Sequence, residues 1–357
     1  MTTPPRLVLP LALAAALGCS SASPPGQRPT AAPAGPRITP QTSGTTNRLQ
    51  AVSAVDERVV WVSGVGGTYA LTTNGGTTWR AAVVPGADSL EFRDVEAVSE
   101  RVAYLLAAGP GDRSRIYRTD DGGRSWSVQF VNRDTSAFYD CFAFWDERSG
   151  FTMSDAVKGR FPVIRTGDGR TWSDIGDRLP RAQTGEGAFA ASGTCTAAMD
   201  DRHGWIATGA AARARVLRTA DRGDSWSEAA TPIAQGSQTS GAATIAFRDT
   251  LHGILAGGDI AAPDAPADNV AVTSDGGRSW SLATRTPFPG AVYGLAYVPA
   301  GDGRTVVATG PSGAGWSTDE GASWRPLGGL RDYWAVGVVG KVGWLVGTEG
   351  RILKLSF

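Results

Sequence analysis

The 357-residue sequence predicts an all-β fold: a seven-bladed β-propeller of four-stranded antiparallel blades, closed by an N-terminal strand. Three observations predict this fold. A tryptophan-containing turn motif recurs six times at a regular spacing, and short apolar strands flank each copy. The last unit lacks a fourth strand, and a segment near the N-terminus can supply it.

The turn motif reads Ser/Thr, any residue, Asp, any residue, Gly, any residue, Ser/Thr, Trp. Asn74 replaces Asp in the first copy, and the third copy is one residue shorter. Asp and Gly favour a tight turn, because Asp bonds to nearby backbone and Gly tolerates a positive φ. The indole then packs beneath the turn. Successive motif tryptophans are 47, 46, 54, 54 and 44 residues apart, at Trp79, Trp126, Trp172, Trp226, Trp280 and Trp324.

Each repeat contains four short strands, two of which precede the strand that enters the turn motif. Four strands at this period are typical of a propeller blade. The last unit, from Trp334 to Phe357, has only three strands and no motif. The segment Pro36–Gly44 resembles the residues that follow the fourth motif, so we expect it to add the missing outer strand. Closure of the ring removes open sheet edges.

The N-terminal residues predict an export signal and a linker before the propeller. An apolar run of eleven residues, Leu7–Leu17, follows Arg6 and is shorter than the roughly 20 residues that span a bilayer. We therefore expect a signal peptide over 1–19, a flexible tether rich in Pro, Ala and Ser over 20–36, and the propeller over 37–357. Cys19 after Gly18 resembles the bacterial lipoprotein box, which implies lipidation of Cys19. An ordinary signal peptide with an incidental cysteine is the alternative.

The turn motifs resemble Asp-box repeats, also called bacterial neuraminidase repeats. In the period of these repeats, in the strand Trp344–Gly347 and in the expected number of seven blades, the chain resembles the family of photosystem II assembly and stability factors. This resemblance covers roughly residues 38–357. It implies the propeller fold and leaves the activity open, because one fold hosts many functions.

Composition and motifs favour a binding module over an enzyme. Lys and Arg number 34, as do Asp and Glu, and no basic block is present, so we expect no nucleic-acid partner. No motif for a cofactor, a metal or a catalytic nucleophile is found. We therefore expect a monomeric, non-catalytic scaffold, lipid-tethered to the cell envelope, without cofactor or metal, which binds a protein or glycan.

A sialidase-like glycoside hydrolase is the alternative function. Sialidases share a Phe-Arg-Ile-Pro segment and three arginines that bind the substrate carboxylate, and the family has six blades. This chain lacks the segment. Its arginines Arg118, Arg165 and Arg218 occupy one repeat-equivalent slot, so we interpret them as surface positions beside the turn motif.

The face opposite the turn motifs is the predicted binding face. In a four-stranded blade, the turn motifs share a face with the turns between strands one and two. The opposite face carries the irregular segments 153–161, 185–194 and 257–269. Long loops on a rigid ring commonly bind ligands. The residues predicted to reach the channel mouth there are Asp140, Asp155, Glu186, Ser192, Asp259 and Tyr293.

Cysteine and histidine positions also align with the repeat. Cys141 and Cys195 occupy the same point of the innermost strand in adjacent blades. A disulfide and two buried thiols both fit, and we favour thiols because the Cα separation between blades is expected to exceed the bonding range. His203 and His252 precede Gly at one repeat position, so we expect structural turn residues. The tripeptide Arg222–Asp224 lies inside a turn motif and is expected to be structural.

Overall fold

The computed structural model describes residues 1–3 and 35–357. Most of the predicted signal peptide, including its lipidation site Cys19, and most of the predicted tether lie outside the described residues. In the described part of the chain, no helix is long and apolar enough to cross a membrane.

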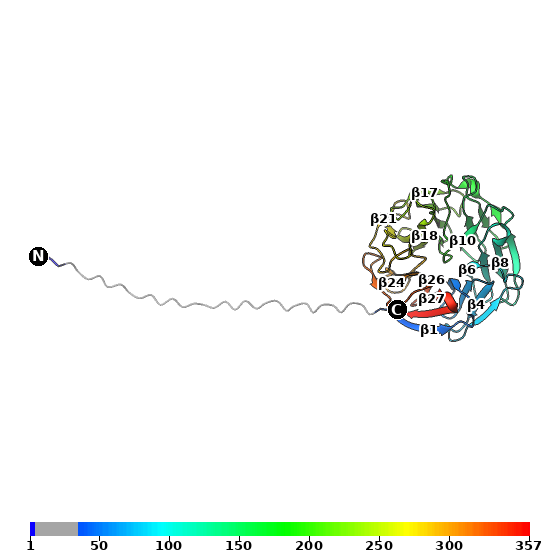
Figure 1. Ribbon diagram of the computed structural model, residues 1–357, viewed down its shortest axis with the longest axis horizontal. Coiled ribbons are helices and arrows are strands. Elements are labelled where there is room, and N and C mark those ends of the chain that lie inside the picture. The colour runs from blue at the N-terminus through cyan, green and yellow to red at the C-terminus, as the bar shows by residue number, and fades with distance from the viewer. Residues whose placement is uncertain (4–34) are drawn as a thin grey trace. The chain divides into compact units, whose positions relative to one another are not determined.

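Seven separate four-stranded sheets form the fold, and each sheet is antiparallel throughout. Figure 1 shows these sheets arranged radially around one axis. The predicted seven-bladed propeller is therefore confirmed. We number the blades in chain order, so that blade 1 begins with the first inner strand and blade 7 contains the C-terminus.

The second strand of each blade is almost entirely buried, whereas the innermost strand is buried along part of its length. The strands nearest the axis are β2 (Leu49–Ala54), β6 (Phe92–Ala97), β10 (Tyr139–Phe144), β14 (Thr196–Met199), β18 (Ser240–Phe247), β22 (Gly294–Val298) and β26 (Tyr333–Val339). The second strands are β3 (Val60–Gly64), β7 (Ala103–Ala107), β11 (Gly150–Ser154), β15 (His203–Ala207), β19 (Gly253–Asp259), β23 (Thr305–Gly310) and β27 (Val342–Gly347).

The two outer strands of each blade flank the turn motif. The third strands are β4 (Thr68–Thr72), β8 (Arg115–Thr119), β12 (Val163–Thr166), β16 (Arg215–Thr219), β20 (Val270–Thr273), β24 (Gly313–Ser317) and β28 (Arg351–Ser356). The outermost strands are β5 (Arg80–Val83), β9 (Ser127–Val131), β13 (Ser173–Asp174), β17 (Ser227–Ala230), β21 (Ser281–Leu282), β25 (Arg325–Pro326) and β1 (Arg37–Thr42). Three short 3₁₀ turns lie at Gly111–Arg113, Gly176–Arg178 and Thr348–Gly350.

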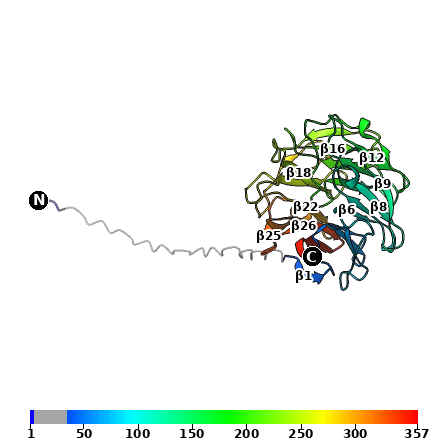
Figure 2. The same cartoon turned by 45° about the vertical axis from the view of Figure 1, so that its right-hand side comes forward.

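The N-terminal strand β1 closes the ring. It pairs antiparallel with β28 over a continuous register, from Arg37 opposite Ser356 to Thr42 opposite Arg351. Figure 2 shows β1 beside the C-terminus in the same blade. Blade 7 therefore joins the two ends of the folded ring, as the sequence predicts.

Each turn motif is a network of short hydrogen bonds. In blade 2, the Asp121 carboxylate accepts bonds from the Ser125 amide at 2.9 Å and the Ser125 hydroxyl at 2.6 Å. The Thr119 hydroxyl bonds Asp121 at 2.9 Å and accepts the Gly123 amide at 2.9 Å. These donors lower the pKa of Asp121 to about 2. The motif residues are thus committed to the turn itself.

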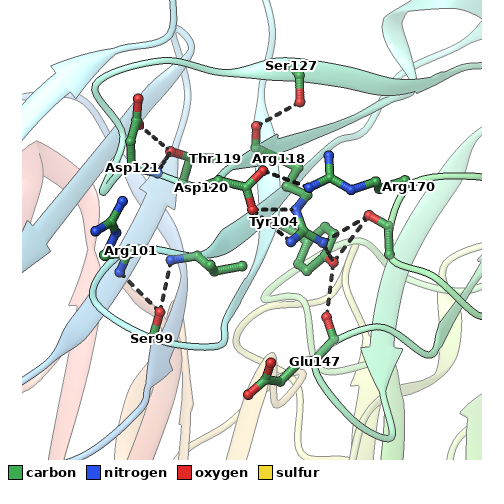
Figure 3. Close-up of polar contacts among 12 residues, drawn as sticks. Ser99, Arg101, Tyr104, Arg118, Thr119, Asp120, Asp121, Ser127, Glu147 and Arg170 are labelled. Carbon is green, nitrogen blue, oxygen red and sulfur yellow. Dashed lines mark hydrogen bonds and ion pairs between the residues drawn. The ribbon is translucent and has the colours of Figure 1, made fainter.

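A basic side chain in the third strand bonds the turn motif of the next blade. Figure 3 shows Arg118 between Asp120, on its own blade, and the neighbouring blade. Its guanidinium contacts the Asp120 carboxylate at 2.7 Å and the Gly169 carbonyl at 3.1 Å. The Tyr104 hydroxyl also donates to the Glu147 carbonyl at 3.1 Å. Together these bonds join blades 2 and 3.

The same position performs the same role in other blades. Arg165 donates to the Arg222 carbonyl at 2.7 Å, and Lys354 of the last blade donates to the Gly75 carbonyl at 2.9 Å. Burial and the nearby Arg278 of the next blade lower the pKa of Arg218. The three arginines weighed for a sialidase therefore lie at successive blade contacts. They do not converge on one ligand.

Cys141 and Cys195 form a disulfide, so the prediction of two buried thiols is wrong. Their Cα atoms lie 5.9 Å apart, within the bonding range. Cys141 lies in β10 and Cys195 just before β14, and both are fully buried. The predicted proximity of the two inner strands was right. The separation is smaller than we expected because blades converge toward the axis.

The two histidines and the tripeptide Arg222–Asp224 have structural contacts. The His203 ring lies 2.8 Å from the Asp200 carboxylate, and the His252 ring lies 2.9 Å from that of Asp249. Each aspartate also accepts the backbone amide of its histidine, which braces the turn. Arg222 pairs with Asp146 of the preceding blade at 2.8 Å.

Candidate functional site

The three irregular loops meet at one cavity on the face opposite the turn motifs. This loop-face pocket has a volume of about 420 Å³. Asp155 comes from the first loop, residues 185 and 188–191 from the second, and Ile260 from the third. The predicted convergence of these loops on one face is therefore confirmed. The remaining wall comes from the inner strands and blade links, through Arg93, Phe138, Asp140, Ala210, Gln238, Tyr293 and Trp334.

Three pocket residues are the extra residues of β-bulges. The pairing of the first two strands shifts by one residue at Arg93 in blade 2, at Asp140 in blade 3 and at Trp334 in blade 7. A bulged residue is left out of the ladder, and its side chain is turned away from the regular alternation. Bulges at the same end of three inner strands thus supply a cation, a carboxylate and an indole to one pocket.

Two carboxylates lie in the loop-face pocket. Asp140 is 1% exposed, and its Oδ2 atom has no hydrogen-bond partner among the described residues. Asp155 is half-buried and accepts the Ala188 amide at 3.1 Å. Burial raises the pKa of Asp155 to about 6. Burial and the adjacent Asp155 charge raise the pKa of Asp140 well above its ordinary value.

An aromatic wall flanks these carboxylates. The rings of Tyr293 and Trp334 lie 5.0 Å apart, and both side chains are half-buried. The Arg48 guanidinium lies 4.6 Å above the Trp334 ring. Arg93 is held by Glu91 at 2.7 Å and lies 5.9 Å from the Phe138 ring. The pocket therefore presents rigid aromatic surface beside charged groups, a combination common in protein-binding sites.

Three of the six predicted binding residues line this pocket: Asp140, Asp155 and Tyr293. Glu186 instead lies beneath the second loop, where its fully buried side chain is paired with Arg215 at 2.6 Å. Ser192 donates to the Tyr293 carbonyl at 2.5 Å and faces the central channel. Asp259 accepts the amide of Ala261 at 2.9 Å within its own turn.

Sequence reasoning missed Arg93, Phe138 and Trp334, which complete the pocket. Each lies at the start of an inner strand or in the link just before it. A signal was present for two of them, since Arg93 and Trp334 are the second residues of β6 and β26, at equivalent points of their repeats. Their orientation depends on the bulges, which the alternation of apolar residues does not reveal.

The loop-face pocket contains no cluster suited to a metal. Among the described residues, no group of three or more His, Cys, Asp and Glu side chains has metal-binding geometry. The chemistry of the pocket, as the structure shows it, is that of carboxylates beside aromatic rings.

The Asp155 carboxylate should reduce the stability of the fold at neutral pH. Its folded pKa of about 6 exceeds the ordinary value of 3.8, so it stabilises the fold below pH 4, and this stabilisation is lost as the pH rises to 6. Asp155→Asn keeps the acceptor for Ala188. We expect it to raise the free energy of unfolding at pH 7 by about 1–2 kcal/mol, after allowance for solvent screening, with little change at pH 4.

Urea unfolding at both pH values measures this difference. Asp264→Asn, at an exposed aspartate, is the matched control and should change stability little at either pH. An Asp155→Asn variant that is less stable than the native chain at pH 7 would show that the carboxylate is structurally required.

Comparison with known proteins identifies the fold. No family model matches the chain, and no curated protein matches it. A structure of YCF48 bound to a D1 peptide is 15% identical with a TM-score of 0.60, and the match covers 90% of this chain and 97% of that one. A GH74 xyloglucanase from Xanthomonas campestris is 16% identical with a TM-score of 0.59, covering 88% of this chain and 53% of that one.

A third similar structure is a virginiamycin B lyase from Staphylococcus aureus with quinupristin. It is 12% identical with a TM-score of 0.63, and the match covers 90% of this chain and 99% of that one. One of these three proteins was solved with a peptide, and the other two are enzymes of different classes. At these identities the similarity shows the fold alone, and this chain shares the propeller architecture with binding proteins and enzymes alike.

Proposed function

We propose that this chain is a non-catalytic, exported propeller that binds a protein partner at its loop-face pocket. The observation that supports this proposal most strongly is the pocket itself. There an aromatic pair, Tyr293 and Trp334, lies beside two carboxyl groups whose charged forms are disfavoured by burial. Groups that lower stability and cluster in one cavity mark functional sites more often than structural ones. Cys19 would tether the protein to the cell envelope by a lipid.

The peptide-bound YCF48 structure supports this proposal because it is a propeller that was solved with a peptide. Aromatic anchors in a partly desolvated pocket dominate the energy of many protein interfaces. The pocket of this chain has both an aromatic surface and a rigid frame of inner strands. We therefore favour a protein partner over a glycan.

Crosslinking pull-down from membranes of the native host tests the proposal. Trp334→Ala or Tyr293→Ala should reduce recovery of the specific partner at least about tenfold, because each removes an anchor side chain. Leu251→Ala is the matched control, since Leu251 is 47% exposed in the turn before β19, on the face that carries the turn motifs. Equal recovery with all three variants would contradict the proposal.

A glycoside hydrolase remains the second candidate, because one observation favours it. Asp140 and Asp155 share a cavity and have raised pKa values, as the acid of a hydrolase pair does. The 1% exposure of Asp140 argues against direct contact with a sugar. Hydrolysis of any aryl glycoside in a panel, abolished by Asp155→Asn, would replace the binding proposal with this one.

A further inference from the structure

The central channel forms a second cavity, separate from the loop-face pocket. It has a volume of about 760 Å³, and inner strands of all seven blades line it. Its lining comes mostly from the ends of these strands that lead into the strand one–two turns, so this channel cavity lies toward the face of the turn motifs. Nothing in the proposed function uses it.

The second irregular loop closes the channel cavity on the other side. Its residues 188–191 line the loop-face pocket, whereas 192–194 line the channel cavity. Ser192 bonds the Tyr293 carbonyl at 2.5 Å, and the Thr194 hydroxyl bonds that of Thr244 at 2.7 Å. The loop is thus fixed to β18 of the adjacent blade 5 and to the link before β22 of blade 6, and it forms the floor of the channel cavity.

Glu96 stands in the channel cavity at a position that holds small residues in other blades. It lies in β6 opposite Tyr104, which in turn pairs with the residue just before the turn motif, Arg118. All six other blades have an equivalent pair. Their inner-strand residues are Ser53, Ala143, Ala197, Ala246, Ala296 and Gly337. One blade therefore places a carboxylate where the six others have small, uncharged residues.

Glu96 has no internal counter-ion. Among the described residues, it makes no hydrogen bond and no ion pair, and its side chain is only half-buried. Burial raises its pKa to about 7, and no cation offsets that effect. The structure therefore places an uncompensated carboxyl group in a cavity that has apolar as well as polar walls.

The other charged groups around the channel cavity are already bonded. Asp94 accepts the amides of Val95 and Phe142, both at 2.8 Å. Arg248 pairs with Glu320 at 2.6 Å and with Asp249 at 2.8 Å. Asp302 at the rim accepts the Arg304 amide at 3.0 Å. Glu96 thus differs from each of them in lacking a partner.

We propose that the channel cavity binds an organic monocation, an ammonium group on an apolar body, with Glu96 as its counter-ion. The apolar body would contact Phe144, Ala197, Ala246 and Ala296, which line the same cavity and are half-buried. A cation restores the interaction that the partly desolvated carboxylate lacks, and the apolar side chains of the cavity would pack against its apolar body. The volume is within the range of cavities that hold small molecules. The cation can be a free amine or a lysine side chain of a polypeptide.

Isothermal titration of the folded chain with 2-phenylethylamine at pH 7.5 tests the proposal. The amine should bind at least about tenfold more tightly than 2-phenylethanol or 3-phenylpropanoate, because only the amine pairs with the carboxylate. Glu96→Gln should remove this preference and leave alcohol binding unchanged. Glu100→Gln, the same substitution at an exposed glutamate just after β6, should keep the preference.

A second titration, with a lysine derivative, distinguishes a free amine from a lysine side chain as the source of the cation. Tighter binding of N-acetyl-lysine methylamide than of 2-phenylethylamine would indicate a polypeptide side chain, and the reverse order a free amine. Either order supports the proposal. Equal binding of amine, alcohol and acid would overturn it, as would an unchanged preference in Glu96→Gln or no binding of any amine at millimolar concentration. The loop-face variants Trp334→Ala and Tyr293→Ala should leave these outcomes unchanged, because neither residue lines the channel cavity.

Discussion

Loss of the disulfide between Cys141 and Cys195 should lower the free energy of unfolding by about 4 kcal/mol. The bond closes a loop of 54 residues. In the chain-entropy model, closing a loop of this length lowers the entropy of the unfolded chain and so raises its free energy by about that amount. The bond also joins blades 3 and 4 close to the axis, where both cysteines are fully buried. The double variant Cys141→Ala, Cys195→Ala should therefore unfold at a markedly lower urea concentration.

A reductant provides the control for this prediction. Reduction of the native chain should shift its unfolding midpoint toward that of the double variant, whereas the double variant should not respond. A native chain that keeps its midpoint under full reduction would show that the blade contacts alone hold this part of the ring.

Arg215→Met should destabilise the fold by about 3–5 kcal/mol, because it leaves the Glu186 carboxylate buried without its cation. The guanidinium of Arg215 bonds both carboxylate oxygens of Glu186 at 2.6 Å. The side chains are 8% and 0% exposed, respectively. Thr208 and the amide of Gln183 also donate to this carboxylate, at 2.7 Å and 2.8 Å. Glu186 thus fixes the start of the loop that floors the channel cavity.

The double variant Arg215→Met, Glu186→Gln should recover part of this loss, since it removes the buried charge. Arg285→Met, at a surface arginine that is 56% exposed and pairs with Asp268, is the control and should cost less than about 1 kcal/mol. An equal effect at both arginines would mean that the buried pair contributes no more than a surface pair.

The sequence predicted the fold because its signal is local and repeated. Each motif tryptophan and its Asp-Gly turn specify one hairpin, and six copies at a regular spacing imply a ring. The closing strand was also predictable, because the last unit visibly lacks one. The role of Arg118 was not predictable, because its partner Gly169 belongs to the turn motif of the next blade. No local sequence pattern relates the two residues.

The candidate site was predicted only in part, and the reason is geometric. The sequence located the loops that meet in the pocket, and with them Asp140, Asp155 and Tyr293. It placed Glu186 at the channel mouth because a loop acid is ordinarily exposed, but Arg215 draws this side chain inside. It missed Trp334 because a bulge, and not the strand alternation, sets the direction of that side chain.

Site-specific photo-crosslinking tests the binding face most directly. A p-benzoylphenylalanine at Ile260, an exposed residue that lines the loop-face pocket, should give one discrete adduct in native membranes. The same probe at Leu251 should give none, and Trp334→Ala should abolish the adduct at Ile260. An adduct from Leu251 alone, or equal adducts from both positions, would contradict the assignment of partner binding to the loop-face pocket.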